Sequence, residues 1–262
     1  MPVFAANLTM LWPEIGDPYD RLRAAAEAGF ALVERLFVHD LDIERTRRLL
    51  ADLDLRLVLF DPYPGDWGAG ERGLLAMPGR EAELRDTVHA AIDHATTLGT
   101  DRLNVLSGML PEGVTRDEAV EVASANLAAL APAAREAGIT LMVEPINDID
   151  WPGYAIPTVT DALRVITAVG HPAVGLQFDA YHVARAGEDP ITVLDGCFEH
   201  VRHVQIADVP GRHQPGTGRL DIEAFLDRLD ALGYGGAVGL EYLPDGDTEE
   251  ALAWLSPDRR RG

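Results

Sequence analysis

Residues 135–145 read REAGITLMVEP, and this stretch contains the unit from which the fold is built. A helical pattern that begins at Thr115 ends at Gly138, and glycine is the residue that most often follows a helix. An apolar strand pattern, TLMVE, comes next and ends on Glu144. A helix that leads through a glycine into a buried strand is typical of a βαβ unit.

The same unit recurs along the whole chain. Strands are expected at 3–7, 31–36, 55–60, 102–106, 140–144, 174–179, 203–207 and 237–241. Helices are expected at 17–29, 42–53, 81–99, 115–138, 158–170, 191–200, 221–233 and 247–255. Eight such units fill the ~250 residues of a (β/α)8 barrel at ~30 residues each. The sequence therefore predicts an α/β fold: a single TIM-barrel domain over 1–262, with 255–262 as a flexible tail.

An open, doubly wound sheet is the rival architecture for strict strand–helix alternation. It usually has a glycine-rich turn after its first strand, whereas the first strand here is followed by LTML, which contains no glycine. The barrel is therefore the preferred prediction.

The net charge of −21 limits the classes of molecule that the protein is expected to bind. Such a chain repels phosphate backbones and anionic lipid, so we expect neither nucleic-acid nor membrane binding. No stretch approaches the ~18 apolar residues of a membrane span, and the first residues lack a basic leader. We expect a cytoplasmic protein that acts on a small molecule. Whether it forms a homo-oligomer stays open.

The numbers of cysteine and lysine residues exclude several kinds of covalent, metal-binding and phosphate-binding site. Cys197 is the single cysteine, which rules out an intrachain disulfide and cysteine-rich zinc sites, and its apolar surroundings favour a buried structural thiol. The chain has no lysine, which rules out Schiff-base catalysis and a P-loop lysine.

Strands five to eight each end on a side chain of the kind that binds metal ions. These residues are Glu144, Asp179, Gln205 and Glu241. Closure of a barrel brings the carboxyl ends of its strands together at one rim, where active sites of this fold lie. Neighbouring carboxylates repel by about 4 kcal/mol per pair at ~4 Å, so protons or a cation must relieve them. All-oxygen ligands favour Mg²⁺ or Mn²⁺.

Other groups near these strand ends suit a small polar substrate. Arg212, in the loop after strand seven, could clamp a carboxylate through its two parallel N–H donors. Trp67, like Trp12 and Trp151, lies in a loop after a strand and could form an apolar pocket wall. Asn147, just beyond Glu144, is a further candidate for substrate contact, although whether it touches the substrate stays open. The PGTG segment at 215–218 indicates a turn rather than a phosphate loop.

Several motifs in fixed order point to a family. These are FAANLTML, GDWGAGERG, VEPIN, QFDAYH, HVQIAD, PGTG and GLEY. Over essentially the whole chain they resemble the hydroxypyruvate isomerase family within the xylose-isomerase-like TIM barrels. The resemblance implies a metal-dependent isomerase that interconverts hydroxypyruvate and tartronate semialdehyde, or acts on a closely related small 2-oxo acid, by proton transfer through an enediolate.

The resemblance also implies residue roles. Glu144 and Glu241 match the two catalytic glutamates, Asp179 and Gln205 complete the metal set, and His182 and Arg212 match substrate contacts. The segments FVHD at 37–40 and DPYPGDW at 61–67 depart from the family pattern, which leaves substrate identity open. The alternatives are a ketose 3-epimerase or sugar isomerase on the same metal site, a dehydratase, an abasic-site endonuclease and a non-catalytic sugar-acid binding protein. The endonuclease requires a basic groove, against which the charge argues.

Overall fold

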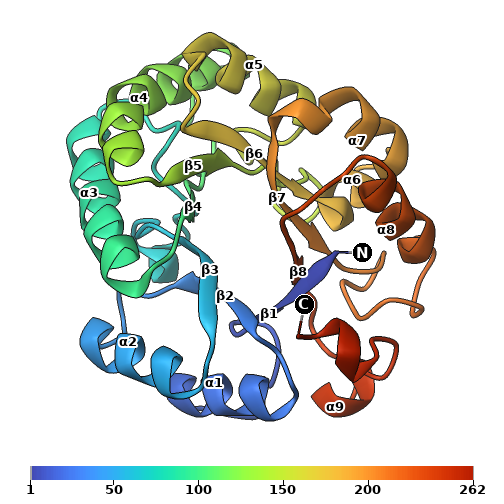
Figure 1. Ribbon diagram of the computed structural model, residues 1–262. Coiled ribbons are helices and arrows are strands. Elements are labelled where there is room, and N and C mark those ends of the chain that lie inside the picture. The colour runs from blue at the N-terminus through green and yellow to red at the C-terminus, as the bar shows by residue number, and fades with distance from the viewer. Residues whose placement is uncertain (1, 262) are drawn as a thin grey trace.

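Eight parallel strands form a closed barrel surrounded by helices, as the sequence predicts (Figure 1). The computed structural model describes residues 2–261. The strands are β1 (Val3–Asn7), β2 (Leu32–Phe37), β3 (Arg56–Asp61), β4 (Arg102–Asn104), β5 (Thr140–Val143), β6 (Val174–Asp179), β7 (Val201–Ile206) and β8 (Ala237–Leu240). Each strand pairs with its neighbours in the sequence, and β1 closes the barrel by pairing with β8.

Helices connect the strands on the outside of the barrel (Figure 1). The α-helices are α1 (Pro18–Glu27), α2 (Ile43–Asp52), α3 (Glu81–Leu98), α4 (Arg116–Glu136), α5 (Val159–Val169), α6 (Ala180–Arg185), α7 (Pro190–Cys197), α8 (Ile222–Ala231) and α9 (Thr248–Ala251). Three 3₁₀ turns, η1 (Trp67–Ala69), η2 (Phe198–His200) and η3 (Pro257–Arg259), complete the elements found within residues 2–261.

Local capping explains why most helices begin and end where the sequence predicts. Asp42 accepts a hydrogen bond from the backbone of α2, and Thr115 and Glu118 form a reciprocal capping box at α4. Gly99 and Gly170 follow α3 and α5 with left-handed φ angles of 73° and 57°. The short helix α6 was not predicted, because it follows β6 with no intervening loop.

The C-terminal segment differs from the prediction of a long helix and a flexible tail. Helix α9 spans only four residues. Arg260 is buried, and its guanidinium donates to the backbone oxygens of Leu252, Leu255 and Ala28. The bond to Ala28 ties the segment after α9 to the turn after α1, and Leu255 and Arg260 are buried although their neighbours are mostly exposed. Residue 262 lies outside the described part of the chain.

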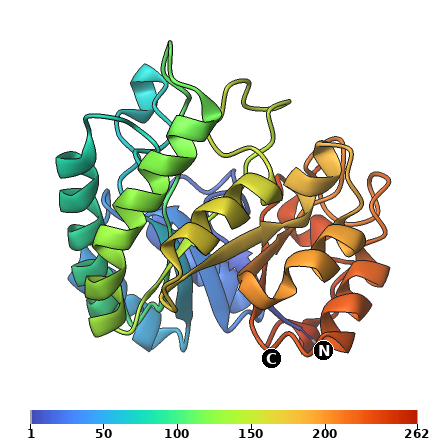
Figure 2. The ribbon, with the colours of Figure 1, turned by 90° about the horizontal axis from the view of Figure 1, so that it is seen from above.

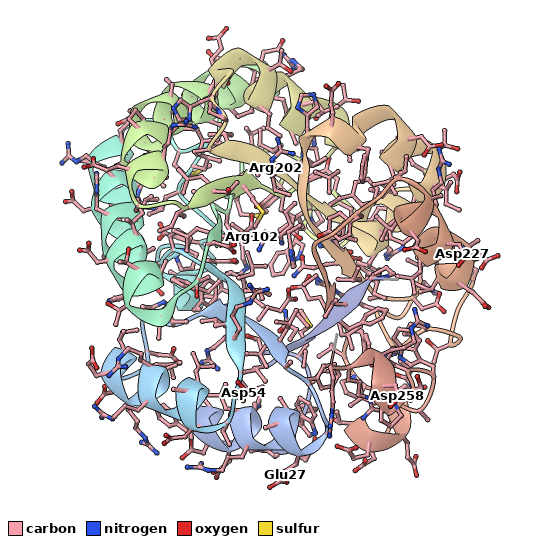
Figure 3. The ribbon with its side chains drawn as sticks, viewed as in Figure 1. Glu27, Asp54, Arg102, Arg202, Asp227 and Asp258 are labelled. Carbon is pink, nitrogen blue, oxygen red and sulfur yellow. The ribbon has the colours of Figure 1, made fainter. Side chains whose placement is uncertain are left out.

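Side chains from several strands occupy the interior of the barrel. Arg102 and Arg202 lie within the ring of strands in Figure 3, whereas Glu27 and Asp227 lie on the outer surface. Arg102 Nε donates to the Arg202 carbonyl 3.0 Å away, from β4 to β7. A small buried cluster that includes Leu59 and Met142 also lies inside the molecule. The interior is thus filled by side chains, as in other barrels of this type.

The loops that follow β3, β4 and β5 rise above one end of the barrel, opposite the end where both termini lie (Figure 2). Cys197 is buried at the end of α7, and burial raises the pKa of its thiol to about 12, which agrees with a structural role. Across residues 2–261, every helix is too short or too polar to cross a membrane.

Candidate active site

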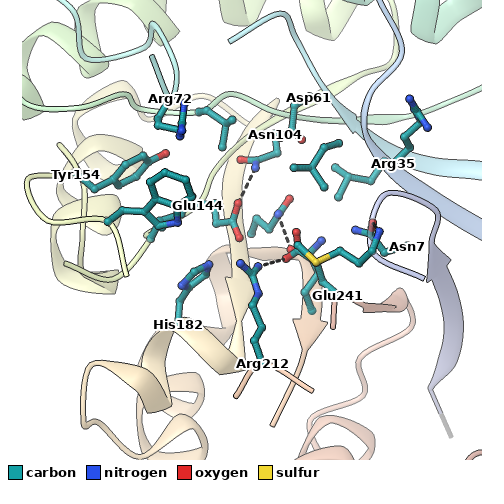
Figure 4. A pocket seen from close by; sticks show the side chains of 18 of the residues that line it. Asn7, Arg35, Asp61, Arg72, Asn104, Glu144, Tyr154, His182, Arg212 and Glu241 are labelled. Atoms are coloured by element: carbon teal, nitrogen blue, oxygen red, sulfur yellow. Dashed lines mark hydrogen bonds and ion pairs between the residues drawn. The ribbon is translucent and has the colours of Figure 1, made fainter. Parts of the chain in front are cut away.

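A cavity of about 120 Å³ opens at the carboxyl ends of the strands (Figure 4). It is smaller than the ~300–1,000 Å³ typical of pockets for drug-sized ligands, which favours a small ligand. Six of the residues predicted for the site line it, namely Glu144, His182, Gln205, Arg212, Glu241 and Trp67. The barrel therefore brings most of the predicted side chains to one place.

Three carboxylates converge here from different strands, two that line the cavity and a third, Asp179, that lies close to Glu144 without lining it. Glu144 follows β5, Asp179 ends β6 and Glu241 follows β8, and all three are buried. Arg212 lies among them, with Nη2 2.9 Å from Glu241 Oε2 and 3.7 Å from Asp179 Oδ2. Glu144 Oε2 accepts a hydrogen bond of 2.7 Å from the amide of Asn104.

The carboxylates are held in an environment that disfavours their charge. Burial and the neighbouring Asp179 raise the pKa of Glu144 to about 8, although Arg212 and Asn104 oppose the shift. Burial likewise raises the pKa of Asp179, and burial with Glu144 and Asp179 holds the pKa of Glu241 well above its usual range. Burial and the same glutamates also raise the pKa of Asp61, at the end of β3. A cation or bound protons must relieve this cluster.

Two of its oxygens are unused within the described residues. Asp179 Oδ2 and Glu241 Oε2 are buried and accept no hydrogen bond, although Arg212 is close to both. Ligand atoms of Glu144, Asp179 and His182 lie within 4.8 Å of one another. Buried oxygens without donors, on carboxylates that repel each other, are the donor set that a hard divalent cation requires. The residues present therefore fit such a cation.

The hydrogen bonds of His182 fix which of its ring nitrogens carries the proton. Asn147 Oδ1 accepts from the backbone N–H groups of Ile149 and Asp150, so its Nδ2 must face His182 Nδ1, 2.7 Å away. His182 Nδ1 is therefore the acceptor, and Nε2 carries the proton. Nε2 lies 3.5 Å from Asp179 Oδ2. Burial and Arg212 hold the pKa of His182 well below its usual range, so the ring is neutral.

Asn147 therefore corrects one expectation. It is 1% exposed and is not among the residues that line the cavity, because its amide faces His182 and the adjacent loop. The sequence makes it a candidate for direct substrate contact. Its place in the structure is instead behind His182, where it orients the ring.

A buried carboxylate beneath the site orients Gln205. Glu34, in β2, accepts hydrogen bonds from Gln205 Nε2 at 2.8 Å and Asn7 Nδ2 at 2.9 Å, and lies 2.8 Å from His203 Nε2. Because a carboxylate only accepts, the amide nitrogen of Gln205 must face Glu34. A Cβ at Gly239 would overlap the Glu34 carboxylate, so glycine is required there. Gln205 Oε1 accepts from Gln177 and retains a second lone pair.

The loop after β7 is organised around one aspartate, Asp208. Its two carboxylate oxygens accept hydrogen bonds from four backbone N–H groups at 2.8–3.0 Å, those of Val209, Gly216, Gly218 and Leu220. The PGTG segment is thus a turn around Asp208, as predicted. Arg212 lies in this loop with a left-handed φ of 57°, an uncommon conformation for a residue with a side chain. The loop thereby holds the guanidinium of Arg212 at the carboxylates.

We expect Asp208→Asn to destabilise the protein by about 1–3 kcal/mol, because either orientation of the amide points its NH₂ group at two backbone donors. Urea denaturation measures the loss. The matched control is Asp221→Asn, since Asp221 caps α8 by accepting from Ala224 and asparagine caps equally well. Equal stability of the two variants would show that the loop does not depend on Asp208.

The wall opposite β7 and β8 is formed by three loops that pair with one another. Short bridges join Gly73 to Ser107 and Met109 to Tyr154. Trp67 and Trp151 come from two of these loops and lie 6.0 Å apart. Trp12 is buried against Phe30 instead and does not line the cavity. The long loop at 62–80 is therefore part of the site.

Sequence reasoning missed several residues of the cavity. Asn7, Arg35, Arg72, Asn104, Tyr154 and Gln177 all line it. A signal was present for those in strands, since Asn7 and Asn104 are polar residues in apolar strand patterns. Arg72 lies in the GERG motif, but the motif alone does not show where its side chain points.

Comparisons with known proteins agree with this geometry. The family model described as xylose isomerase-like TIM barrel matches residues 22–257. The chain is 40% identical to the 2-oxo-tetronate isomerase of Cupriavidus necator, covering 98% of each chain. It is 38% identical to the hydroxypyruvate isomerase of Escherichia coli, covering 98% and 99%.

Solved structures give the same fold. A Brucella melitensis protein described as an AP endonuclease of family 2 superposes with a TM-score of 0.94 at 41% identity, covering 98% of this chain and 99% of that one. An L-ribulose 3-epimerase superposes with a TM-score of 0.75 at 23% identity, covering 97% and 86%, and this likeness shows the fold alone.

Proposed function

The chain belongs to the xylose isomerase-like TIM barrel family, and we propose that it isomerises a small 2-oxo acid, interconverting hydroxypyruvate and tartronate semialdehyde or moving the carbonyl group of a closely related acid. Two relatives at 38% and 40% identity carry the names hydroxypyruvate isomerase and 2-oxo-tetronate isomerase. The observation that carries the proposal is the small cavity that two buried glutamates line together.

The reaction requires balanced proton movements. In hydroxypyruvate a proton leaves C3 and a proton is added to C2, while a proton leaves the C3 hydroxyl and one is gained by the C2 oxygen. The species between the two states is an enediolate. A side chain that accepts a carbon-bound proton must be able to exist in both protonation states near working pH, as a buried carboxylate with a raised pKa does.

We assign the two proton carriers to Glu144 and Glu241. Both line the cavity, they come from β5 and β8, and they are 5% and 6% exposed, so water has little access to them. Asn104 holds one oxygen of Glu144, and Arg212 holds Glu241. One glutamate removes the C3 proton and the other delivers a proton to C2.

We assign the divalent cation to Glu144, Asp179, Gln205 and Glu241, with Mg²⁺ or Mn²⁺ as the ion. The unused oxygens of Asp179 and Glu241 and the free lone pair of Gln205 support the assignment. When bound, such an ion supplies Lewis acidity that makes the proton next to a carbonyl easier to remove. Glu34 keeps the amide oxygen of Gln205 turned away from itself and available.

His182 and Arg212 are proposed to orient the substrate. The proton on His182 Nε2, fixed by Asn147, gives this residue a donor at the cavity, suited to a carbonyl or hydroxyl oxygen. Arg212 offers a second donor beside Glu241. Trp67 and Trp151 supply an aromatic wall of the cavity.

A substrate screen tests the proposal. The protein, supplied with Mg²⁺ or Mn²⁺, is assayed with hydroxypyruvate, 2-oxo-tetronate, ketopentoses and ketohexoses. We expect kcat/KM for the short acids to exceed that for the sugars by on the order of 100-fold, because the cavity is small. A preference for the sugars would identify a ketose 3-epimerase instead. Binding without turnover of every compound would identify a sugar-acid binding protein.

A further inference from the structure

We propose that Arg72 binds the carboxylate of the substrate and thereby selects 2-oxo acids over neutral hydroxyketones. This inference deepens the proposed function and rests on it for the reaction, although carboxylate binding by Arg72 is separately measurable. It names the residue that separates this active site from those of enzymes acting on uncharged sugars.

Two tryptophans hold the guanidinium of Arg72 in place. Its central carbon lies 4.0 Å from the centre of the Trp67 ring and 4.6 Å from that of Trp151. Nη1 donates to the backbone oxygens of Trp67, at 2.9 Å, and Glu71, at 2.7 Å. Stacking against aromatic faces fixes a guanidinium while leaving N–H donors at its edge for a ligand.

The remaining donors of Arg72 are unused. Nε is buried and has no hydrogen-bond partner, and Nη2 makes no hydrogen bond within residues 2–261. No carboxylate of the described chain forms an ion pair with Arg72, although the protein carries a net charge of −21. A positive charge kept free of acidic partners in so acidic a protein indicates an anionic ligand.

The two other arginines at the cavity are already engaged. Arg212 pairs with Glu241 and lies close to Asp179. Arg35 pairs with Asp40 at 2.9 Å and donates to the backbone oxygen of Phe37. Arg72 is therefore the lining arginine, within the part of the chain that the structure describes, whose charge is not neutralised.

The backbone beside Arg72 is fixed by close packing. Gly73 has a φ of 128°, and a Cβ there would overlap the backbone oxygen of Leu106. Its N–H donates to the carbonyl of Pro64 at 2.9 Å. The loop after β3 thus presents Arg72 from a rigid position, and a preorganised donor loses less entropy when a ligand binds.

The position of Arg72 fits the geometry of a 2-oxo acid. Figure 4 shows Arg72 and Tyr154 on one side of Glu144, and Arg212 and Glu241 on the other. A carboxylate at Arg72 directs the adjacent C2 and C3 atoms toward Glu144 and Glu241. A neutral hydroxyketone of the same length lacks the group that Arg72 would bind.

The test compares Arg72→Gln with the wild-type protein, both loaded with Mn²⁺. Calorimetric titration measures the binding of glycerate, an unreactive acid. Inhibition kinetics measure the binding of dihydroxyacetone, the neutral counterpart of hydroxypyruvate. We expect glycerate affinity to fall roughly 10- to 100-fold and dihydroxyacetone affinity to change less than about threefold. With hydroxypyruvate, the loss should lie mainly in KM, because the carboxylate does not change during the reaction.

Two further variants control the experiment. Arg85→Gln removes the same charge from an exposed position on α3 and should leave glycerate binding unchanged. Arg72→Lys keeps the charge but loses the planar donors, so it should recover part of the affinity and also shows that the loop tolerates substitution.

Equal glycerate affinity in the wild-type protein and Arg72→Gln would overturn the proposal, as would an equal loss of acid and neutral ligand. Glycerate binding that depends on Arg72, in a protein that isomerises no 2-oxo acid, would support the carboxylate site and refute the proposed function. Isomerisation of hydroxypyruvate that is unaffected by Arg72→Gln would support the proposed function and refute the carboxylate site.

Discussion

Glu144→Gln is expected to reduce turnover of hydroxypyruvate by about 100- to 10,000-fold, because an amide cannot take up the proton that leaves the substrate carbon. Glutamine has the same shape as glutamate, and its oxygen can still accept the hydrogen bond from Asn104. Steady-state kinetics at saturating substrate measure the loss, which should appear in kcat. Thermal unfolding should show that the variant is folded.

The matched control for this variant is Glu121→Gln, which makes the same change at an exposed position on α4. It should retain full activity, which excludes an effect of net charge alone. Turnover by Glu144→Gln within a factor of about three of the wild type would rule out Glu144 as a proton carrier.

Removal of divalent cations is expected to abolish activity and to lower the thermal stability of the protein. Buried carboxylates that repel one another gain most from a cation between them. At a metal concentration of about 100 times Kd, binding stabilises the folded state by about 2.7 kcal/mol. Dialysis against a chelator, followed by titration with Mg²⁺ or Mn²⁺, should restore both properties.

Asp179→Asn tests which residues hold the cation. Asparagine can still accept the hydrogen bond from the backbone of Tyr181 that begins α6, but it lacks the charge. We expect metal affinity to fall by on the order of 100-fold or more. Asp42→Asn makes the same change at the start of α2, far from the cavity, and should leave metal affinity unchanged. A metal-induced rise in melting temperature that is the same in Asp179→Asn and the wild type would contradict the assignment.

The sequence was sufficient to predict the barrel because the two periodicities of its strands and helices alternate without interruption. Capping residues such as Thr115 and glycines such as Gly138 marked the boundaries. The C-terminal segment was mispredicted for a physical reason. Arg260 looked solvated within a short basic run, whereas three backbone carbonyls bring it into the interior.

The site was predictable where it depends on strand ends and not where it depends on loops. Glu144, Gln205 and Glu241 could be placed because neighbouring strands of a barrel bring their ends to one rim. Asn147 was misplaced because adjacency to Glu144 in the sequence does not show which way a loop side chain points. Arg72 depends on the paired loops around Gly73 and Ser107, a contact that sequence spacing does not encode.

The most direct test of the account follows the conversion of hydroxypyruvate in D₂O by proton NMR. The protein is loaded with Mn²⁺ or Mg²⁺, and the metal-loaded protein is removed before spectra are recorded. Proton transfer through Glu144 and Glu241 predicts that tartronate semialdehyde forms faster than in the absence of protein and carries solvent deuterium at C2. No enzyme-dependent formation of tartronate semialdehyde would contradict isomerisation of hydroxypyruvate, and a product with only protium at C2 would contradict proton transfer through these glutamates.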